Sequence, residues 1–382
     1  MSRARILVRR VHLWLGLSLG LLFVLLGLTG SALVFYVEID AALNRSAVGE
    51  AHGPTPGWSS PVWDQALATA RERWPAGDWS FEATGAGGAI PARYYPASQH
   101  HGHHAEREMV WFSPDGSEVL RAEPWGGYLM SWLYELHMHL LAGETGRQIV
   151  GWSGVAMLVL LVSGIAAWWP RGSWRKALAF KRRAAPIRRL RDLHKHFGLW
   201  SSLLLLVLVG TGVLLALPDV KTQVIGAAIA TPDTLPAPRS TAREGTQISV
   251  AAALAAAHRA LPDARLAFID VPPAGDKPFR MRMQVPGDPH QRFPGSFVFV
   301  DPYSGRVLAV HDIRRGNAGT TVSAWIRTLH DGSVGGTPVR ILVLLLGLVP
   351  AALFGTGLLH WLRRRRAPRL RTQTKTSSGS IS

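Results

Sequence analysis

Cysteine is missing from this sequence of 382 residues. Without it the chain can hold no disulfide bond, no thiolate-bound iron–sulfur cluster and no thiol redox centre. The zinc-protease pattern H-E-x-x-H is also missing, and the Gly-rich stretch GAGGA at 85–89 lacks the strand-to-helix context of a dinucleotide site. We therefore expect no chemistry based on thiols, a zinc ion or a bound dinucleotide.

Long apolar runs are what the sequence has in abundance. Helices of roughly 20 apolar residues cross a hydrocarbon core of about 30 Å, and four runs approach that length. The first run exceeds a signal-peptide core and no A-x-A cleavage site follows it, so we expect it to remain as an anchor. The runs are Leu13–Val37, Ile149–Trp169, Phe197–Leu217 and Val339–Leu362.

Acidic residues are few, and 42 Lys and Arg against 25 Asp and Glu give a net charge of +17. Basic residues crowd the segment before the first run, the loop between the second and third, and the tail after the fourth. The positive-inside rule places these three segments, and thus both termini, in the cytoplasm. No base-reading motif accompanies the charge, so nucleic-acid binding is not expected.

The two long segments on the other side are each predicted to fold as a small α+β module. Helical periodicity is followed in each by alternating apolar residues around turn signals. The first module is a rougher copy of the second. The expected helices are 62–74 and 250–261, and the expected strands and hairpins are 108–123, 265–271, 278–285 and 296–310.

An internal repeat relates the two halves of the chain. The pattern W-[L/I]-x-x-L-H occurs as WLYELH at 132–137 and as WIRTLH at 325–330, and later Arg, Gly and Trp residues keep the same offset. The first and third runs also match, each with a His and a later Thr-Gly pair. We therefore predict a mainly α membrane protein of two tandem units, each a span, an outer module and a second span. The expected order is the N-terminus with span one (1–37), the first outer module (38–130), a His segment with span two (131–170), a basic loop (171–193), span three (194–218), the second outer module (219–324), a His segment with span four (325–362) and a basic tail (363–382).

Four histidines at repeated positions fall into two pairs by depth. His12 and His194, the inner pair, begin spans that enter from the cytoplasm, whereas His137 and His330, the outer pair, precede spans that enter from outside. A lone interfacial His is more often a hydrogen-bonded residue than a ligand, but duplicated and opposed copies favour a shared ligand. Imidazole is the usual neutral nitrogen ligand of haem iron, so we predict one bis-His haem at each face.

Three further histidines leave the ligand assignment open. His139 and His196 lie two residues from His137 and His194, and residues two apart on a helix face different ways. The repeat register favours His137 and His194. His360, at the cytoplasmic end of span four, is a further substitute ligand for the inner site.

Two arginines, Arg147 and Arg340, follow the outer histidines by ten residues each. Guanidinium groups match carboxylates, so both could pair with haem propionates. A role as interfacial anchors is equally open.

Several motifs resemble those of PepSY-associated transmembrane proteins, an iron-regulated inner-membrane group of bacteria that includes siderophore-iron reductases. The motifs are HLWLGL and GLTGSAL in span one, LHMHLLAGETGRQIVG before span two, LHKHFGLW in span three and LHDGSVGG before span four. The resemblance, which in length and layout extends to a ferrioxamine reductase, implies two haem b groups in a four-helix domain and PepSY-like periplasmic modules. It also implies electron transfer to a ferric siderophore, ferrioxamine-type included, from a cytoplasmic donor or quinol, with no catalytic residue beyond the haem ligands.

The site for the siderophore is the least defined feature. A His-rich tract binds metal in some proteins but here lies in a Gly-containing polar loop, where a solvated loop is at least as expected. Aromatic residues of the first module could line a siderophore surface, although packing on the sheet is the better expectation. The residues are His100, His101, His103 and His104 in the tract, and Trp111, Trp125 and Tyr128 among the aromatics.

Two other functions stay open. A siderophore permease would need a polar path, but the spans carry almost no charge. A non-enzymatic PepSY regulator would use the outer modules alone and would leave the histidine pairs unexplained. Haem content separates both from the reductase.

Overall fold

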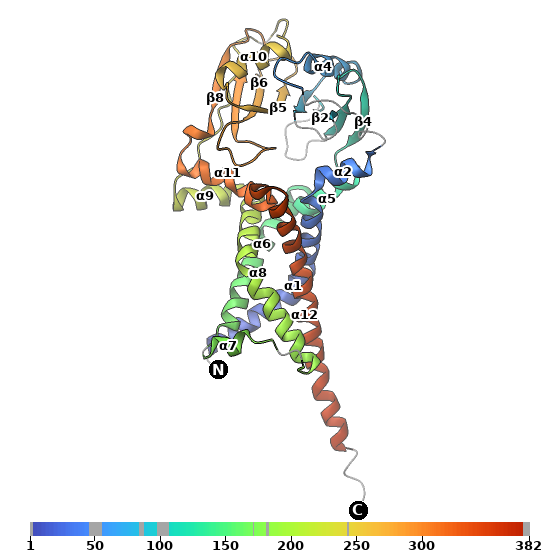
Figure 1. The fold of residues 1–382 in the computed structure, drawn as a ribbon, viewed down its shortest axis with the longest axis vertical. Coiled ribbons are helices and arrows are strands. Elements are labelled where there is room, and N and C mark those ends of the chain that lie inside the picture. Colours follow the sequence, from blue (N-terminus) through green and yellow to red (C-terminus); the bar gives the residue numbers. More distant parts are fainter. Residues whose placement is uncertain are drawn as a thin grey trace, which may run out of the picture.

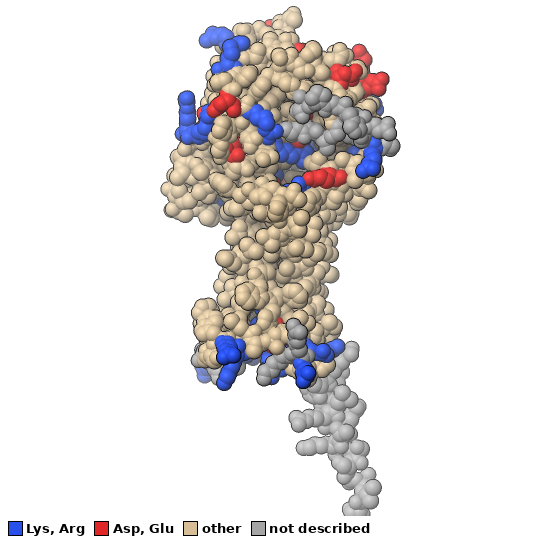
Figure 2. Space-filling model, viewed as in Figure 1, with Lys and Arg blue, Asp and Glu red and all other residues tan. Residues whose placement is uncertain are grey.

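The computed structural model describes residues 3–45, 56–83, 88–97, 107–170, 172–180, 183–242 and 244–376. A helical stalk carries a mixed α/β head at one end (Figure 1). Figure 2 shows the middle of the stalk free of charged side chains on the visible face, while Lys and Arg gather at the end away from the head. This distribution is what a membrane-spanning bundle with one basic face requires.

Four helices form the stalk: α1 (Arg3–Leu33), α6 (Gly143–Trp168), α8 (Pro186–Ala216) and α12 (Gly336–Thr376). Each is long and apolar enough to cross a membrane. Each overlaps one of the four apolar runs, so the prediction of a multi-pass membrane protein is confirmed. Helix α1 contacts α6 and α12, and α8 contacts the same two, which closes a four-helix bundle. The short helix α7 (Trp174–Leu178) lies in the basic loop.

Small residues allow α1 and α12 to approach closely. A side chain at Gly27 or at Gly347 would overlap the backbone of the other helix. Ser31 Oγ donates a hydrogen bond to Leu344 O at 2.8 Å across the same contact. Because lipid gives apolar helices no hydrophobic reason to associate, such close backbone packing stabilises the bundle.

Short helices lie where the stalk meets the head (Figure 1). They are α2 (Tyr36–Leu43), α5 (Leu129–His139), α9 (Pro218–Ala228) and α11 (Ala318–Asp331), with the 3₁₀ turns η2 (Ile313–Arg315) and η3 (Ser333–Gly335). Sequence periodicity did not separate them from their neighbours. Two of them, α5 and α11, carry the outer histidines.

The head contains one antiparallel sheet of eight strands in the order β4-β3-β2-β1-β5-β6-β7-β8. Here the expectation of two separate small sheets was wrong. Strand β1 pairs with β5, so Trp79 lies opposite Val271 and Glu82 opposite Phe268, and neither module leaves this edge unpaired. The strands are β1 (Asp78–Glu82), β2 (Ile90–Tyr95), β3 (Glu108–Phe112), β4 (Val119–Pro124), β5 (Arg265–Val271), β6 (Phe279–Gln284), β7 (Ser296–Val300) and β8 (Val307–His311).

Helices α4 (Val62–Arg73) and α10 (Val250–Ala260) cover the face of the sheet that is turned away from the stalk (Figure 1). A single apolar core lies between these helices and the sheet and draws on both modules. Asp64 of α4 accepts hydrogen bonds from Val250 N and Ala251 N at 2.6 and 3.1 Å. A carboxylate at a helix N-terminus satisfies amides that otherwise lack partners, so one module caps a helix of the other.

The stalk-facing side of the sheet has a different composition. Strand alternation places Arg93, Phe268, Arg282 and Phe297 there, on β2, β5, β6 and β7. Glu82 of β1 belongs to the same face. The sheet is therefore apolar towards its helices, and aromatic and charged towards the stalk.

Candidate functional site

The four repeated histidines meet as two pairs at opposite ends of the bundle. The rings of His12 on α1 and His194 on α8, the inner pair, lie 6.1 Å apart between centroids. Those of His137 on α5 and His330 on α11, the outer pair, lie 6.4 Å apart at the head end. Residues more than a hundred positions apart in the chain are thus brought together in the pairs predicted from the sequence.

The centroid separations fit one metal ion between the two rings of each pair. Two in-line metal–imidazole bonds of about 2.0 Å, with roughly 1.1 Å from each nitrogen to its ring centre, give about 6.2 Å between centroids. Direct stacking of the rings would bring the centroids closer. Both pairs therefore have the spacing of axial ligands on either side of one iron.

Every ring is fixed through its δ-nitrogen. The Nδ1 atom lies at hydrogen-bonding distance from a backbone carbonyl of a neighbouring helix, and a carbonyl can only accept, so Nδ1 carries the proton. Among the residues that the structure describes, no hydrogen bond engages Nε2 of these rings, and its lone pair is free for a metal. The bonds join His12 to Leu160 O at 3.0 Å, His194 to Leu353 O at 3.0 Å, His330 to Leu208 O at 2.9 Å, and His137 to the backbone of Leu26 and to Thr29 Oγ1, the latter at 3.0 Å.

A Ser-Gly or Thr-Gly pair seats each ring. The hydroxyl lies beside Nδ1, and the following glycine leaves room for the imidazole, because a Cβ there would meet the ring at 2.8–3.2 Å. The Thr-Gly pairs of spans one and three thus make room for the outer histidines. The seats are Ser163-Gly164 for His12, Thr356-Gly357 for His194, Thr29-Gly30 for His137 and Thr211-Gly212 for His330.

The outer histidines are held neutral. Burial, followed by the influence of His330, lowers the pKa of His137 to about 4, and burial also lowers the pKa of His330. Neutral imidazole is the form that binds iron. The outer pair therefore keeps its ligand state at neutral pH.

The alternative ligands differ from the four in their bonding. His196 lies between two carbonyls, with Nδ1 2.6 Å from Asp192 O and Nε2 2.8 Å from Leu178 O, so both nitrogens are engaged. His139 Nδ1 lies 2.7 Å from a carboxylate oxygen of Glu135. His360 follows Gly357, the seat of His194, by one helical turn and stays an alternative for the inner site.

Arg147 and Arg340 tie helix ends together. Arg147 pairs with Glu144 and donates to the carbonyl of Ala216, the last residue of α8. Arg340 pairs with Glu38 at 2.6 Å and donates to Val34 O just beyond α1, also at 2.6 Å. These contacts give both arginines an anchoring role, and a contact with haem propionates stays a prediction.

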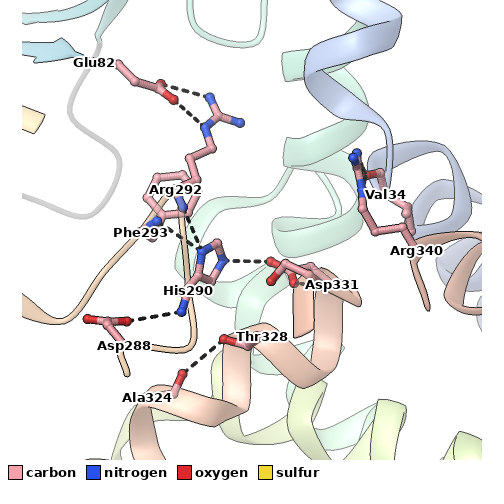
Figure 3. A network of polar contacts seen from close by, with 11 residues as sticks. Val34, Glu82, Asp288, His290, Arg292, Phe293, Ala324, Thr328, Asp331 and Arg340 are labelled. Carbon is pink, nitrogen blue, oxygen red and sulfur yellow. Dashed lines mark hydrogen bonds and ion pairs between the residues drawn. The ribbon is translucent and has the colours of Figure 1, made fainter. Parts of the chain in front are cut away.

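A chain of polar contacts joins the head to the helix that carries His330 (Figure 3). His290 Nε2 donates to Asp331, the residue after His330, at 2.9 Å, while His290 Nδ1 accepts from the backbone N–H groups of Arg292 and Phe293. Arg292 forms two hydrogen bonds with Glu82 of β1, at 2.7 and 3.0 Å. Sequence reasoning missed this link, since only the adjacency of Asp331 to His330 hinted at it.

A comparison with protein-family models now places the chain. The model of the PepSY-associated TM region matches residues 9–364. This protein belongs to the PepSY-associated TM region family. No curated protein matched the chain in a sequence search. The match assigns the family, and the closer resemblance to a ferrioxamine reductase stays a prediction.

In this PepSY-associated chain the aromatic residues proposed for substrate binding are mostly internal. Trp111 and Tyr128 are buried, which agrees with the expectation that they pack on the sheet and not with an exposed siderophore surface. Arg121 stacks on both rings, at 4.3 and 4.7 Å, and Tyr36 bonds the Tyr128 hydroxyl. Trp125 is half-buried and donates to Glu135 at 2.6 Å. These three aromatic residues pack the first module onto α2 and α5.

The His-rich tract, His100, His101, His103 and His104, lies outside the described residues.

Within the described part of this family member, no group of three or more His, Cys, Asp or Glu gathers to hold a metal ion. A haem needs only two axial protein ligands, because its macrocycle supplies the other four. Each histidine pair could supply the two protein ligands that a haem would take.

Proposed function

We propose that this protein binds two b-type haems and carries electrons across the bacterial inner membrane to reduce a ferric siderophore on the periplasmic side. His12 and His194 would hold one group, and His137 and His330 the other. One observation carries the proposal: both pairs have the spacing of two ligands of one iron, with Nδ1 bonded to a carbonyl and Nε2 without a hydrogen bond among the described residues.

The depth of the pairs supports transport of electrons through the bilayer. His12 and Gly30, the seat of His137, lie about 27 Å apart along α1 at 1.5 Å per residue, close to the thickness of a hydrocarbon core. Haem, when bound, supplies the one-electron carrier that neither backbone nor lipid provides. The chain's own part is to hold the axial nitrogens rigidly and to exclude water.

The orientation belongs to the proposal. The basic end of the stalk would face the cytoplasm and the head the periplasm, by the positive-inside rule. A cytoplasmic protein or quinol would donate one electron at the inner pair, and Fe(III) of the chelate would accept it beyond the outer pair. Fe(II) binds anionic oxygen ligands less tightly because its charge is lower, so the chelate then releases the iron.

The two-unit layout is part of the same proposal. Equivalent seats serve both pairs, and β1 and β5 meet at the centre of the strand order with four strands on either side. A tandem duplication accounts for both features. It also explains why each pair takes one histidine from each half.

The test is an optical spectrum of the detergent-purified full chain, oxidised and then chemically reduced, with the haem counted per chain. We expect two low-spin b haems, and His137→Ala or His12→Ala should remove one of them. His196→Ala is the matched control and should keep both, because its nitrogens already bond carbonyls. Folded protein made with ample haem supply that contains none would overturn the proposal and favour a regulator or permease.

A further inference from the structure

The stalk-facing side of the sheet gathers arginines around one aromatic ring. Phe293 lies in the loop between β6 and β7 and stacks on Phe268 at 5.6 Å. Four guanidinium groups lie within 6 Å of its ring centre. They belong to Arg93 at 5.8 Å, Arg282 at 5.9 Å, Arg292 at 5.2 Å and Arg327 at 5.2 Å. We call Phe268, Phe293, Phe297 and Arg93, Arg282 and Arg327 the arginine–phenylalanine cluster.

Three of these arginines have no counter-ion among the described residues. Arg292 is neutralised by its two bonds to Glu82, but in the part of the chain that the structure describes, Arg93, Arg282 and Arg327 form no ion pair. Asp270, a carboxylate near Arg282, is committed to Arg280 at 2.6 Å. Like charges held together without an anion raise the free energy of the fold.

Arg282 shows the cost most directly. Burial lowers the pKa of its guanidinium to about 10, with Arg280, Arg93 and Arg327 acting in the same direction against Asp270. Its Nε atom is buried and has no hydrogen-bond partner among the described residues. A bound anion would supply the missing negative charge.

The cluster lies next to the outer histidine pair. Arg327 precedes His330 by three residues on α11, which is about one helical turn. Arg93, Arg282, Phe293 and Arg327 are all partly exposed, so a ligand in solution can reach them. An anion bound there would lie beside the outer end of the proposed electron path.

We propose that the arginine–phenylalanine cluster binds an anionic ferric chelate of the catecholate class, held by Arg93, Arg282 and Arg327 and by the phenylalanine faces. This proposal rests on the proposed reductase function and names its substrate class. Ferric tris-catecholates are trianionic and aromatic, which suits both guanidinium and ring contacts. A linear ferric trihydroxamate with a free ammonium group is cationic, and the same arginines would repel it.

The test measures binding without turnover, using gallium(III) chelates that cannot be reduced. Full-length haem-loaded protein in nanodiscs is titrated with a gallium(III) tris-catecholate siderophore and with a cationic gallium(III) linear trihydroxamate. We expect the catecholate to bind at least about tenfold more tightly, and Arg282→Gln or Arg327→Gln to weaken it by about tenfold each, as the loss of a charge-assisted hydrogen bond implies. Arg73→Gln is the matched control, because Arg73 stacks on Trp74 at 4.7 Å beyond the other face of the sheet.

Haem propionates are also anionic and would pair with arginine, so they must be told apart from the chelate. If the arginine variants change the haem spectrum or midpoint potential and leave catecholate binding intact, the arginines serve the propionates and the inference is wrong. Equal binding of the two chelates, or tighter binding of the trihydroxamate, overturns it as well. Should the variants not fold, unmodified protein still decides: added KCl must weaken catecholate binding and not trihydroxamate binding.

The two proposals fail separately. Haem-free protein that binds the gallium catecholate through these arginines would keep the inference and remove the reductase. Haem-loaded protein that reduces a ferric trihydroxamate, with no preference for the anionic chelate, would keep the reductase and remove the inference.

Discussion

The inner and outer histidine pairs share one local geometry but depend on different parts of the chain. His12 and His194 lie on α1 and α8, helices of the bundle itself. His137 and His330 lie on the short helices α5 and α11 between bundle and head. The bundle alone therefore positions the inner pair, whereas the outer pair also depends on how the head is held.

This difference suits the proposed direction of electron flow. An inner site needs only a stable place near the donor, while an outer site has to stay aligned with a chelate bound by the head. The contact from His290 to Asp331 links the head to the residue beside His330 (Figure 3). The head, which is proposed to bind substrate, is thereby joined to the helix that carries His330.

The largest effect should come from filling a histidine seat. Gly212→Val adds atoms where even a Cβ would lie 2.8 Å from the His330 ring, an overpacking that costs about 1–3 kcal/mol if the ring stays. We expect the ring to move and the outer haem to be lost, while Gly357→Val should remove the inner haem instead. Haem counts of the purified variants measure both.

Gly210 is the control for the seat. It lies on α8 two residues before Gly212, and a Cβ there meets nothing within 4 Å. Gly210→Val should keep two haems. Equal losses in Gly210→Val and Gly212→Val would show that α8 tolerates no added bulk and that the seat has no special role.

A smaller effect should follow from cutting the tether. His290→Ala removes the hydrogen bond to Asp331, whose side chain is about a third exposed, so a cost of about 1 kcal/mol is expected. The outer haem should dissociate several-fold faster during dilution into apomyoglobin, and the inner haem at its original rate. His258→Ala is the matched control, because His258 of α10 bonds Pro262 O and stacks on Trp58, both on the other face of the sheet. A parallel change at both haems would contradict a separate role for the head.

The sequence predicted the features that depend on local pattern. Apolar runs located the four spans, and the repeat register paired His12 with His194 and His137 with His330. The strands 265–271 and 296–310 were also recognisable, because apolar alternation and turn residues are local signals.

Non-local pairing was beyond the sequence. Whether β1 pairs with β5 depends on where two modules meet, and the β1 sequence DWSFE shows no preference for that partner. The link from His290 to Asp331 joins residues 41 positions apart. The arginine–phenylalanine cluster draws on four strands, a loop and α11, so no single window of sequence contains it.

The smallest effect is spectroscopic and concerns the ring planes. The imidazole planes of the inner pair are nearly perpendicular, at 83°, whereas those of the outer pair are tilted by 41°. Rings closer to parallel donate electron density into the same iron d orbital and separate it in energy from its partner, while perpendicular rings donate equally to both orbitals. Oxidised protein should therefore give two low-spin electron paramagnetic resonance signals, the inner strongly axial and the outer more rhombic. His137→Ala should remove the rhombic signal and leave the axial one. If the axial signal disappears instead, the ring orientations of the two pairs are exchanged in the haem-loaded protein, and the assignment of the two signals is wrong.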